Sequence, residues 1–159
     1  MRRRSLWVYH VNSGGCNGCD IEILAALSPR YDPERLGVKL VESPRHADAI
    51  LLTGPITLQS LPRVVEAIRA AGEVSIVAIG ACACGGGIWH DSSAVVGGVP
   101  SLLKYSKELG IEDCIREVVY VPGCPPRPHA ILYGLALLTG AVSERAGDIV
   151  KKIVVARNV

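Results

Sequence analysis

Short runs of apolar residues alternate with longer segments whose apolar residues recur at helical spacing. The apolar runs predict β-strands at residues 5–12, 37–43, 47–54, 73–80 and 116–123. The helically spaced segments predict helices at residues 20–28, 60–72, 101–109 and 128–140. Continuous apolar strands that alternate with helices indicate a parallel sheet whose two faces are both covered by helices. The pattern therefore predicts an α/β fold with a mostly parallel sheet.

Residue types at the ends of these elements help to define where the helices and loops end. Pro29 closes the first helix, and Gly72 is a suitable C-cap for the second. The glycine-rich stretch that follows the strand 73–80 predicts a loop reaching to about Pro100. We expect a single domain over residues 1–159, with the segment 142–159 packing on that domain or reaching to a partner.

Composition and charge narrow the class of protein. Apolar residues make up 49% of the chain and charged residues 20%, which excludes disorder and leaves more apolar surface than a lone domain needs. We therefore expect the isolated chain to be poorly soluble and its native state to be a complex. A net charge of +2 is too small to indicate nucleic-acid binding, and the basic residues 2–4 are expected to be a solvated end.

No part of the sequence has the pattern of a membrane anchor. The longest apolar run, residues 130–141, is shorter than the roughly 20 residues that cross a bilayer. The N-terminus has no continuous apolar segment of the signal-peptide type. We therefore expect the chain to remain in the cytoplasm, where thiols stay reduced. The six cysteines are then better explained as metal ligands than as disulfides.

Three cysteine-bearing loops each follow a predicted strand directly. Their sequences are GGCNGC, GACACGGG and PGCPP, and they carry Cys16, Cys19, Cys82 and Cys124. Because the carboxyl ends of parallel strands meet at one edge of the sheet, these loops should converge there. Ligands in open α/β folds bind at that edge. The sequence thus predicts one site with four thiolates.

Four thiolates suit either a structural zinc ion or a [4Fe–4S] cluster. Structural zinc sites usually use two close cysteine pairs, whereas this chain offers one pair and two distant single residues. Glycines beside the cysteines let backbone N–H groups approach the sulfurs, and Pro125 follows Cys124 as in bacterial ferredoxins. We favour the cluster, with the positive end of the first helix directed at it. A zinc-binding scaffold and a redox dithiol remain as alternatives.

Two further cysteines are not needed for such a site. Cys84 shares a loop with Cys82 and is an alternative ligand in its place. Cys114 has the surroundings of an ordinary half-buried cysteine.

The motifs GCNGCDIE, GACACGGG and VPGCPPRP, in this order, resemble those of the small electron-transfer subunit of membrane-bound, energy-converting [NiFe] hydrogenases. That subunit is related to the complex I subunit that holds the terminal cluster. The resemblance implies a flavodoxin-like domain and one [4Fe–4S] cluster bound by Cys16, Cys19, Cys82 and Cys124. The spacing of Cys16 and Cys19 is the hydrogenase-like arrangement, since complex I subunits have two adjacent cysteines there.

The resemblance also implies a function and its partners. The chain would relay electrons from ferredoxin-linked clusters to a catalytic large subunit of the [NiFe]-hydrogenase type, with proton reduction coupled to ion pumping. Its partners would be that large subunit, a ferredoxin-type iron–sulfur subunit, soluble ferredoxin and, indirectly, membrane-arm subunits. The complex would lie on the cytoplasmic face of the membrane, with this chain peripheral. The alternative is the equivalent subunit of a sulfur-reducing or complex I-like quinone or ferredoxin oxidoreductase.

No catalytic residue is expected in this chain, because the active site would lie in the large subunit. The resemblance points to Glu22, three residues beyond Cys19, as a candidate for a proton path. An acidic residue near a helix N-terminus is equally well explained by its interaction with the helix dipole.

Overall fold

The computed structural model describes residues 5–142 and 154–155 of the chain. The basic residues 2–4 and all of the segment 143–159 except 154–155 lie outside the described residues. The strands are β1 Leu6–Asn12, β2 Val38–Leu40, β3 Ala49–Thr53, β4 Ile56–Thr57, β5 Val74–Ile79, β6 Val95–Gly97, β7 Ile115–Val121 and β8 Val154–Val155. The helices are α1 Gly18–Ala26, α2 Leu61–Ala71, α3 Gly80–Gly85, α4 Val99–Lys104 and α5 Pro128–Thr139. Among the described residues, the short 3₁₀-helices are η1 Pro33–Leu36, η2 Pro44–His46, η3 Gly87–Trp89 and η4 Glu112–Cys114.

The main sheet has the strand order β2-β1-β3-β5-β7-β8. Its first five strands are parallel to one another, and β8 pairs with β7 in the antiparallel direction. The order of the five parallel strands is the flavodoxin-like doubly wound order, which reverses between β1 and β3. The predicted α/β class, the mostly parallel sheet and its flavodoxin-like arrangement are therefore confirmed.

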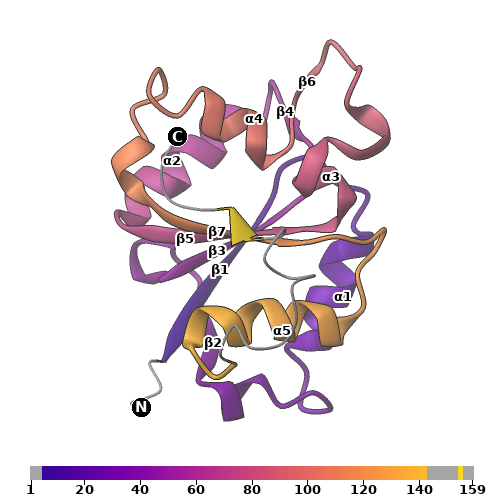
Figure 1. Cartoon of the computed structure of the whole chain (residues 1–159), viewed down its shortest axis with the longest axis vertical. Coiled ribbons are helices and arrows are strands. Elements are labelled where there is room, and N and C mark those ends of the chain that lie inside the picture. Colours follow the sequence, from indigo (N-terminus) through magenta and orange to yellow (C-terminus); the bar gives the residue numbers. More distant parts are fainter. Residues whose placement is uncertain (1–4, 143–153, 156–159) are drawn as a thin grey trace.

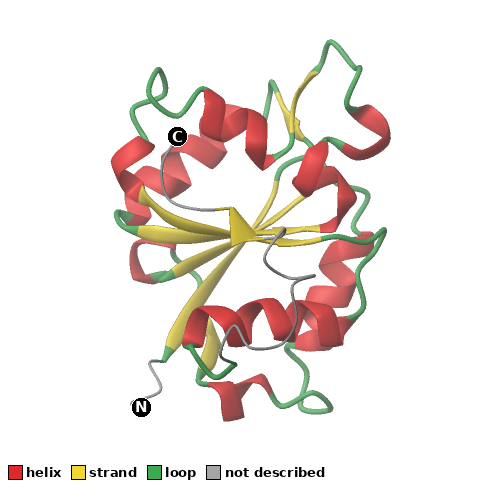
Figure 2. Cartoon of the chain, in the orientation of Figure 1, coloured by secondary structure: helices red, strands yellow, loops and turns green. Residues whose placement is uncertain are grey.

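Helices cover both faces of the sheet. Helices α1 and α5 lie on one face, and α2, α3 and α4 lie on the other (Figures 1 and 2). Strand β3 shows why the central strands are largely apolar, since all five of its residues are buried and the first four of them are aliphatic. Ala49 and Leu51 belong to the core under α1 and α5, whereas Ile50 and Leu52 belong to the core under α2, α3 and α4. Side chains alternate between the two faces along a strand, so a strand covered on both faces carries apolar residues toward both of them.

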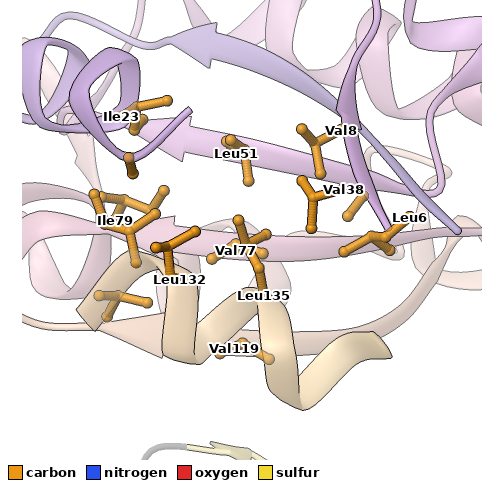
Figure 3. Close-up of a cluster of buried hydrophobic side chains, with 14 residues drawn as sticks. Leu6, Val8, Ile23, Val38, Leu51, Val77, Ile79, Val119, Leu132 and Leu135 are labelled. Atoms are coloured by element: carbon orange, nitrogen blue, oxygen red, sulfur yellow. The ribbon is translucent and has the colours of Figure 1, made fainter. Parts of the chain in front are cut away.

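The core under α1 and α5 holds the first and last cysteine-bearing loops in place. Leu132 and Leu135 of α5 point toward the sheet, where Val77 lies close to them, and Ile23 of α1 belongs to the same cluster (Figure 3). Burying an aliphatic side chain of this size contributes about 1.5–3 kcal/mol. This packing fixes the helix that follows Cys16 and the helix that follows Cys124 to the same sheet face.

The second predicted helix agrees closely with α2. Val64, Val65 and Ile68 are buried against the sheet, and Arg63, Glu66 and Arg69 are exposed. Gly72 is the C-cap, with a φ of 76° in the left-handed region that favours glycine. Helix α1 lies two residues earlier than the predicted helix 20–28: it begins at Gly18 and ends at Ala26, before Pro29. Of the predicted strand 37–43, only Val38–Leu40 forms a strand.

Two predictions for the middle of the chain were wrong. The stretch after β5 is not a continuous loop, because it forms helix α3 and strand β6, and β6 pairs with β4 in a small antiparallel ribbon. Burial of Ala83 against the core outweighs the low helix propensity of its glycine neighbours. Helix α4 spans Val99–Lys104, and not residues 101–109, because Pro100 is well suited to the first turn of a helix.

The described part of the chain contains no helix that is long and apolar enough to cross a membrane.

Candidate metal centre

All four predicted ligand cysteines line one pocket at the carboxyl edge of the sheet. The pocket lies beyond the ends of β1, β3, β5 and β7, and it includes the point between β1 and β3 where the strand order reverses. Its lining residues are Gly15, Cys16, Asn17, Gly18, Cys19, Asp20, Thr53, Gly54, Ala81, Cys82, Gly123, Cys124 and Pro125. The structure thus confirms that the three loops converge.

The first loop is held by side-chain hydrogen bonds at its base. The Asn12 side-chain oxygen accepts bonds from the backbone N–H groups of Gly14 and Gly15, at 2.8 and 2.7 Å. The buried Ser13 hydroxyl donates to the carbonyl of Thr53 at 2.8 Å, which ties the end of β1 to the end of β3. Helix α1 then begins at Gly18, so Cys19 lies in its first turn. Cys16 and Cys19 are thereby brought to the same side of the sheet edge.

Glycine allows the second loop to approach the first and the third. Gly80 begins α3 with a φ of 90°, and a side chain there would collide with the Cys19 sulfur. The neighbouring Ala81 N–H donates to the carbonyl of Gly123 in the third loop at 2.7 Å. Gly87, with a φ of 58°, would place a Cβ 2.7 Å from the Cys82 sulfur. Only residues without a Cβ let these segments pack so closely around the cysteines.

The thiols influence one another electrostatically. Burial, followed in importance by the charges of Asp20 and the other three cysteines, raises the pKa of Cys19 to about 11. Burial, Cys124 and Cys16 also raise the pKa of Cys82. Four negative sulfurs cannot gather in one partly buried pocket without a compensating positive charge. The donor set therefore favours thiols in the free chain and thiolates when a metal centre is bound.

The thiols are arranged around the pocket. Within the described part of the chain, no three His, Cys, Asp or Glu side chains are placed to hold one metal ion between them. Cys16 and Cys124 are exposed, whereas Cys19 and Cys82 are partly buried. A [4Fe–4S] cluster takes one thiolate at each of four irons, so four thiolates around a pocket fit its chemistry.

Cys84 does not line this pocket. It is two residues from Cys82 on α3, its side chain packs against the core under α2, α3 and α4, and its thiol donates to the Ala78 carbonyl at 3.5 Å. Burial raises its pKa to about 11. Cys114 packs at the rim of the same core. All six cysteines are free thiols. The geometry thus favours Cys82 over Cys84 as the residue that faces the site.

Glu22 lies on α1, one turn beyond Cys19, and is partly buried. It is not among the residues that line the pocket.

A group of polar residues beside the cysteines was missed by sequence reasoning. Asp20 lines the pocket and accepts hydrogen bonds from His10, Asn12 and Thr53. The sequence does place Asp20 directly after Cys19, which could have marked it as a residue of the site. Its three hydrogen-bond partners lie on β1 and β3, and they could not be identified without the register of the sheet.

Comparison with known proteins identifies the family. Residues 16–138 match the family model described as NADH ubiquinone oxidoreductase, 20 Kd subunit. The chain is 53% identical over 135 residues to the probable membrane-bound hydrogenase subunit mbhJ of Pyrococcus furiosus, covering 84% of this chain and 74% of that protein. It is 43% identical over 144 residues to formate hydrogenlyase subunit 7 of Escherichia coli, covering 90% of this chain and 52% of that protein.

A solved structure shares the fold. A chain of the membrane-bound sulfane sulfur reductase, an archaeal respiratory membrane complex, superposes with a TM-score of 0.67 at 31% identity, covering 91% of this chain and 74% of that chain. These relatives are all subunits of oxidoreductase complexes. The protein therefore belongs to the family of the 20 kDa subunit of NADH ubiquinone oxidoreductase.

Proposed function

We propose that this chain binds one [4Fe–4S] cluster through Cys16, Cys19, Cys82 and Cys124. With it, the chain serves as an electron-transfer subunit of a membrane-bound, hydrogenase-type complex. The observation that carries the proposal is the convergence of these four thiols, from three distant segments, on one pocket. Membership of a family whose relatives are subunits of hydrogenase and respiratory complexes supports it.

The chemistry supplied by such a cluster is the gain and loss of one electron at low potential. The chain's own residues supply the binding site and its shape. Gly80 and Gly87 leave room for the sulfurs of Cys19 and Cys82. Cys16 and Cys124 are the exposed members of the set, so the pocket faces solvent on their side. That side is where a second redox centre can approach.

Exposed apolar side chains support a protein partner near this site. Ile21 and Leu24 of α1 are each 64% exposed, and Ile88 and Trp89 of η3, which follows α3, are 83% and 51% exposed. Large apolar side chains on the two helical segments that flank the cysteine loops are typical of a surface buried in a complex. The partners in this proposal are a large [NiFe]-hydrogenase-like subunit, which accepts electrons, and a ferredoxin-type iron–sulfur subunit, which supplies them from soluble ferredoxin.

The proposed location is the cytoplasmic face of the membrane, with the chain held there by other subunits of the complex. The names of two relatives, a membrane-bound hydrogenase subunit and a membrane-bound sulfane sulfur reductase, support a membrane complex. Proton reduction coupled to ion pumping is the proposed overall reaction, because the hydrogenase subunit is 53% identical to this chain.

A second candidate function is electron transfer within a sulfur-reducing complex. The similarity to the sulfane sulfur reductase chain favours it over a quinone-reducing role, since the spacing of Cys16 and Cys19 differs from the adjacent cysteines expected in complex I. The same site would serve both functions, because the acceptor is bound by the large subunit. Purification of the native complex and assay with protons or with sulfur compounds as acceptor separates the two.

Iron and acid-labile sulfide analysis of the anaerobically purified chain tests the proposed cofactor. We expect about four of each per chain and a low-temperature electron paramagnetic resonance (EPR) signal on reduction. Replacing any one of the four ligand cysteines by alanine should abolish or alter that signal, whereas Cys114→Ala should leave it intact. Stoichiometric zinc without iron would establish the zinc-scaffold alternative.

The relay itself is tested in the intact complex. Reduced ferredoxin should reduce the cluster, and addition of the acceptor should reoxidise it. A cluster whose oxidation state does not change during turnover would be structural, and the proposed function would then be wrong.

A further inference from the structure

The carboxylate of Asp20 is held at the edge of the cysteine pocket by three side chains. One oxygen accepts a hydrogen bond from Thr53 Oγ1 at 2.6 Å and lies 2.8 Å from His10 Nε2. The other oxygen accepts from Asn12 Nδ2 at 2.5 Å. An ionised carboxylate can only accept, so His10 must donate from Nε2. The three donors come from β1 and β3, while Asp20 is on α1, so the carboxylate cannot turn away from the pocket without breaking bonds to two strands.

The surroundings of Asp20 allow its negative charge to act strongly on the pocket. Its side chain is only 15% exposed. Of the described residues that line the pocket, Asp20 is the one with a carboxylate, and no Lys, Arg or His is among them. A charge that is shielded from water acts over short distances with much less attenuation than a surface charge. The electrostatic potential in the pocket is therefore more negative than the cysteines alone would make it.

The place of Asp20 in the pocket gives the direction of this effect. Asp20 follows Cys19 directly in the chain, and its side chain lines the same pocket as the four thiols. An electron added to a cluster bound by those thiols is a negative charge placed close to the carboxylate. Like charges repel at short range, so the cluster would be harder to reduce.

We propose that Asp20 lowers the reduction potential of the cluster by presenting a negative charge that His10, Asn12 and Thr53 hold at the pocket edge. The inference rests on the proposed function, since it needs a cluster bound by the four cysteines. Asp20 binds no iron in this proposal. It sets how strongly reducing the relay is, and so which acceptors the chain can serve.

Two variants test the charge in opposite directions. Asp20→Asn keeps the size of the side chain and removes the charge, so the midpoint potential should become more positive. His10→Phe keeps an aromatic ring and removes one donor to the carboxylate. Whether His10 is neutral or charged, its loss leaves the carboxylate less compensated, so the potential should become more negative. Glu66→Gln is the matched control, because Glu66 is an exposed acid on α2.

The measurement is a redox titration of the cluster EPR signal in the full-length chain or its native complex, after iron and sulfide have been quantified. An unchanged potential in an iron-loaded Asp20→Asn variant would overturn the inference while leaving the proposed function standing. A wild-type chain without iron would overturn the proposed function itself. If Asp20→Asn does not retain iron, His10→Phe decides: a more negative potential supports the inference, and an unchanged or more positive one refutes it.

Discussion

Gly80 is the residue at which the three cysteine-bearing segments meet, and Gly80→Ala is the sharpest test of the site's geometry. Gly80 begins α3 directly after β5, and a Cβ there would collide with the sulfur of Cys19 from the first loop and come within 3.5 Å of the Gly123 carbonyl in the third. One added methyl group therefore disturbs all three segments.

The expected magnitude has two contributions. The φ of Gly80 is 90°, and holding a residue with a Cβ in a left-handed conformation costs roughly 1–2 kcal/mol. Inserting a methyl group into a closely packed site costs roughly 1–3 kcal/mol more. We expect the free energy of unfolding to fall by about 2–5 kcal/mol, which for a chain of this size corresponds to a Tm lower by roughly 4–20 °C. The displaced Cys19 sulfur should also reduce the iron content.

Gly85→Ala is the matched control in the same helix. Gly85 is the last residue of α3, it is exposed, and a Cβ there would have no neighbour within 4 Å. Its substitution should change the free energy of unfolding by no more than about 0.5 kcal/mol, as is usual for surface sites. Iron and sulfide analysis and thermal unfolding by circular dichroism, on chains purified in parallel, provide the comparison. Wild-type iron content and Tm in Gly80→Ala, or equal damage in both variants, would show that the close approach at Gly80 does not matter.

Two further predictions concern residues near the pocket. Cys84→Ala should retain the cluster and lower the free energy of unfolding by about 1 kcal/mol, because the thiol packs in the core and its loss leaves a small cavity. If this variant loses the EPR signal and Cys82→Ala retains it, the ligand assignment is reversed. If Glu22 belongs to a proton path, Glu22→Gln in the native complex should lower turnover by roughly 10²-fold with the EPR signal intact. Turnover equal to that of the wild type would show that Glu22 has no role in proton transfer and is an acidic residue near the helix N-terminus only.

Much of the fold could be predicted from the sequence, because its cause is local. Strand β3 has four consecutive aliphatic residues, Ala49 to Leu52, since both of its faces are covered, and that signature is visible without coordinates. A run of parallel strands then places every following loop at one edge, so convergence of the cysteine loops followed from the order of elements alone. The bounds of α2 and its cap at Gly72 were readable for the same reason.

The segment after β5 shows where local reasoning failed. Its glycines predicted a loop, yet burial of Ala83 against the sheet makes it helical. The seating of that helix also determines which of Cys82 and Cys84 lines the pocket. Residues two apart on a helix point in nearly opposite directions, at about 100° of rotation per residue, so only one of the two can face the pocket. Which one does so depends on how α3 is seated on the sheet, and that is set by packing with residues far away in the sequence.

The sequence by itself determined the fold class, the edge at which the site lies and the four thiols that it offers, because hydrophobic periodicity and residue order are properties of the chain alone. Only the tertiary structure decided that Cys84 turns into the core and that Asp20 is held by His10, Asn12 and Thr53 at the pocket edge. The physical reason is that both outcomes depend on the contacts between β1, β3 and the helices. Those contacts join residues far apart in the sequence, such as His10 and Thr53, which are separated by 43 positions, and no local pattern specifies them.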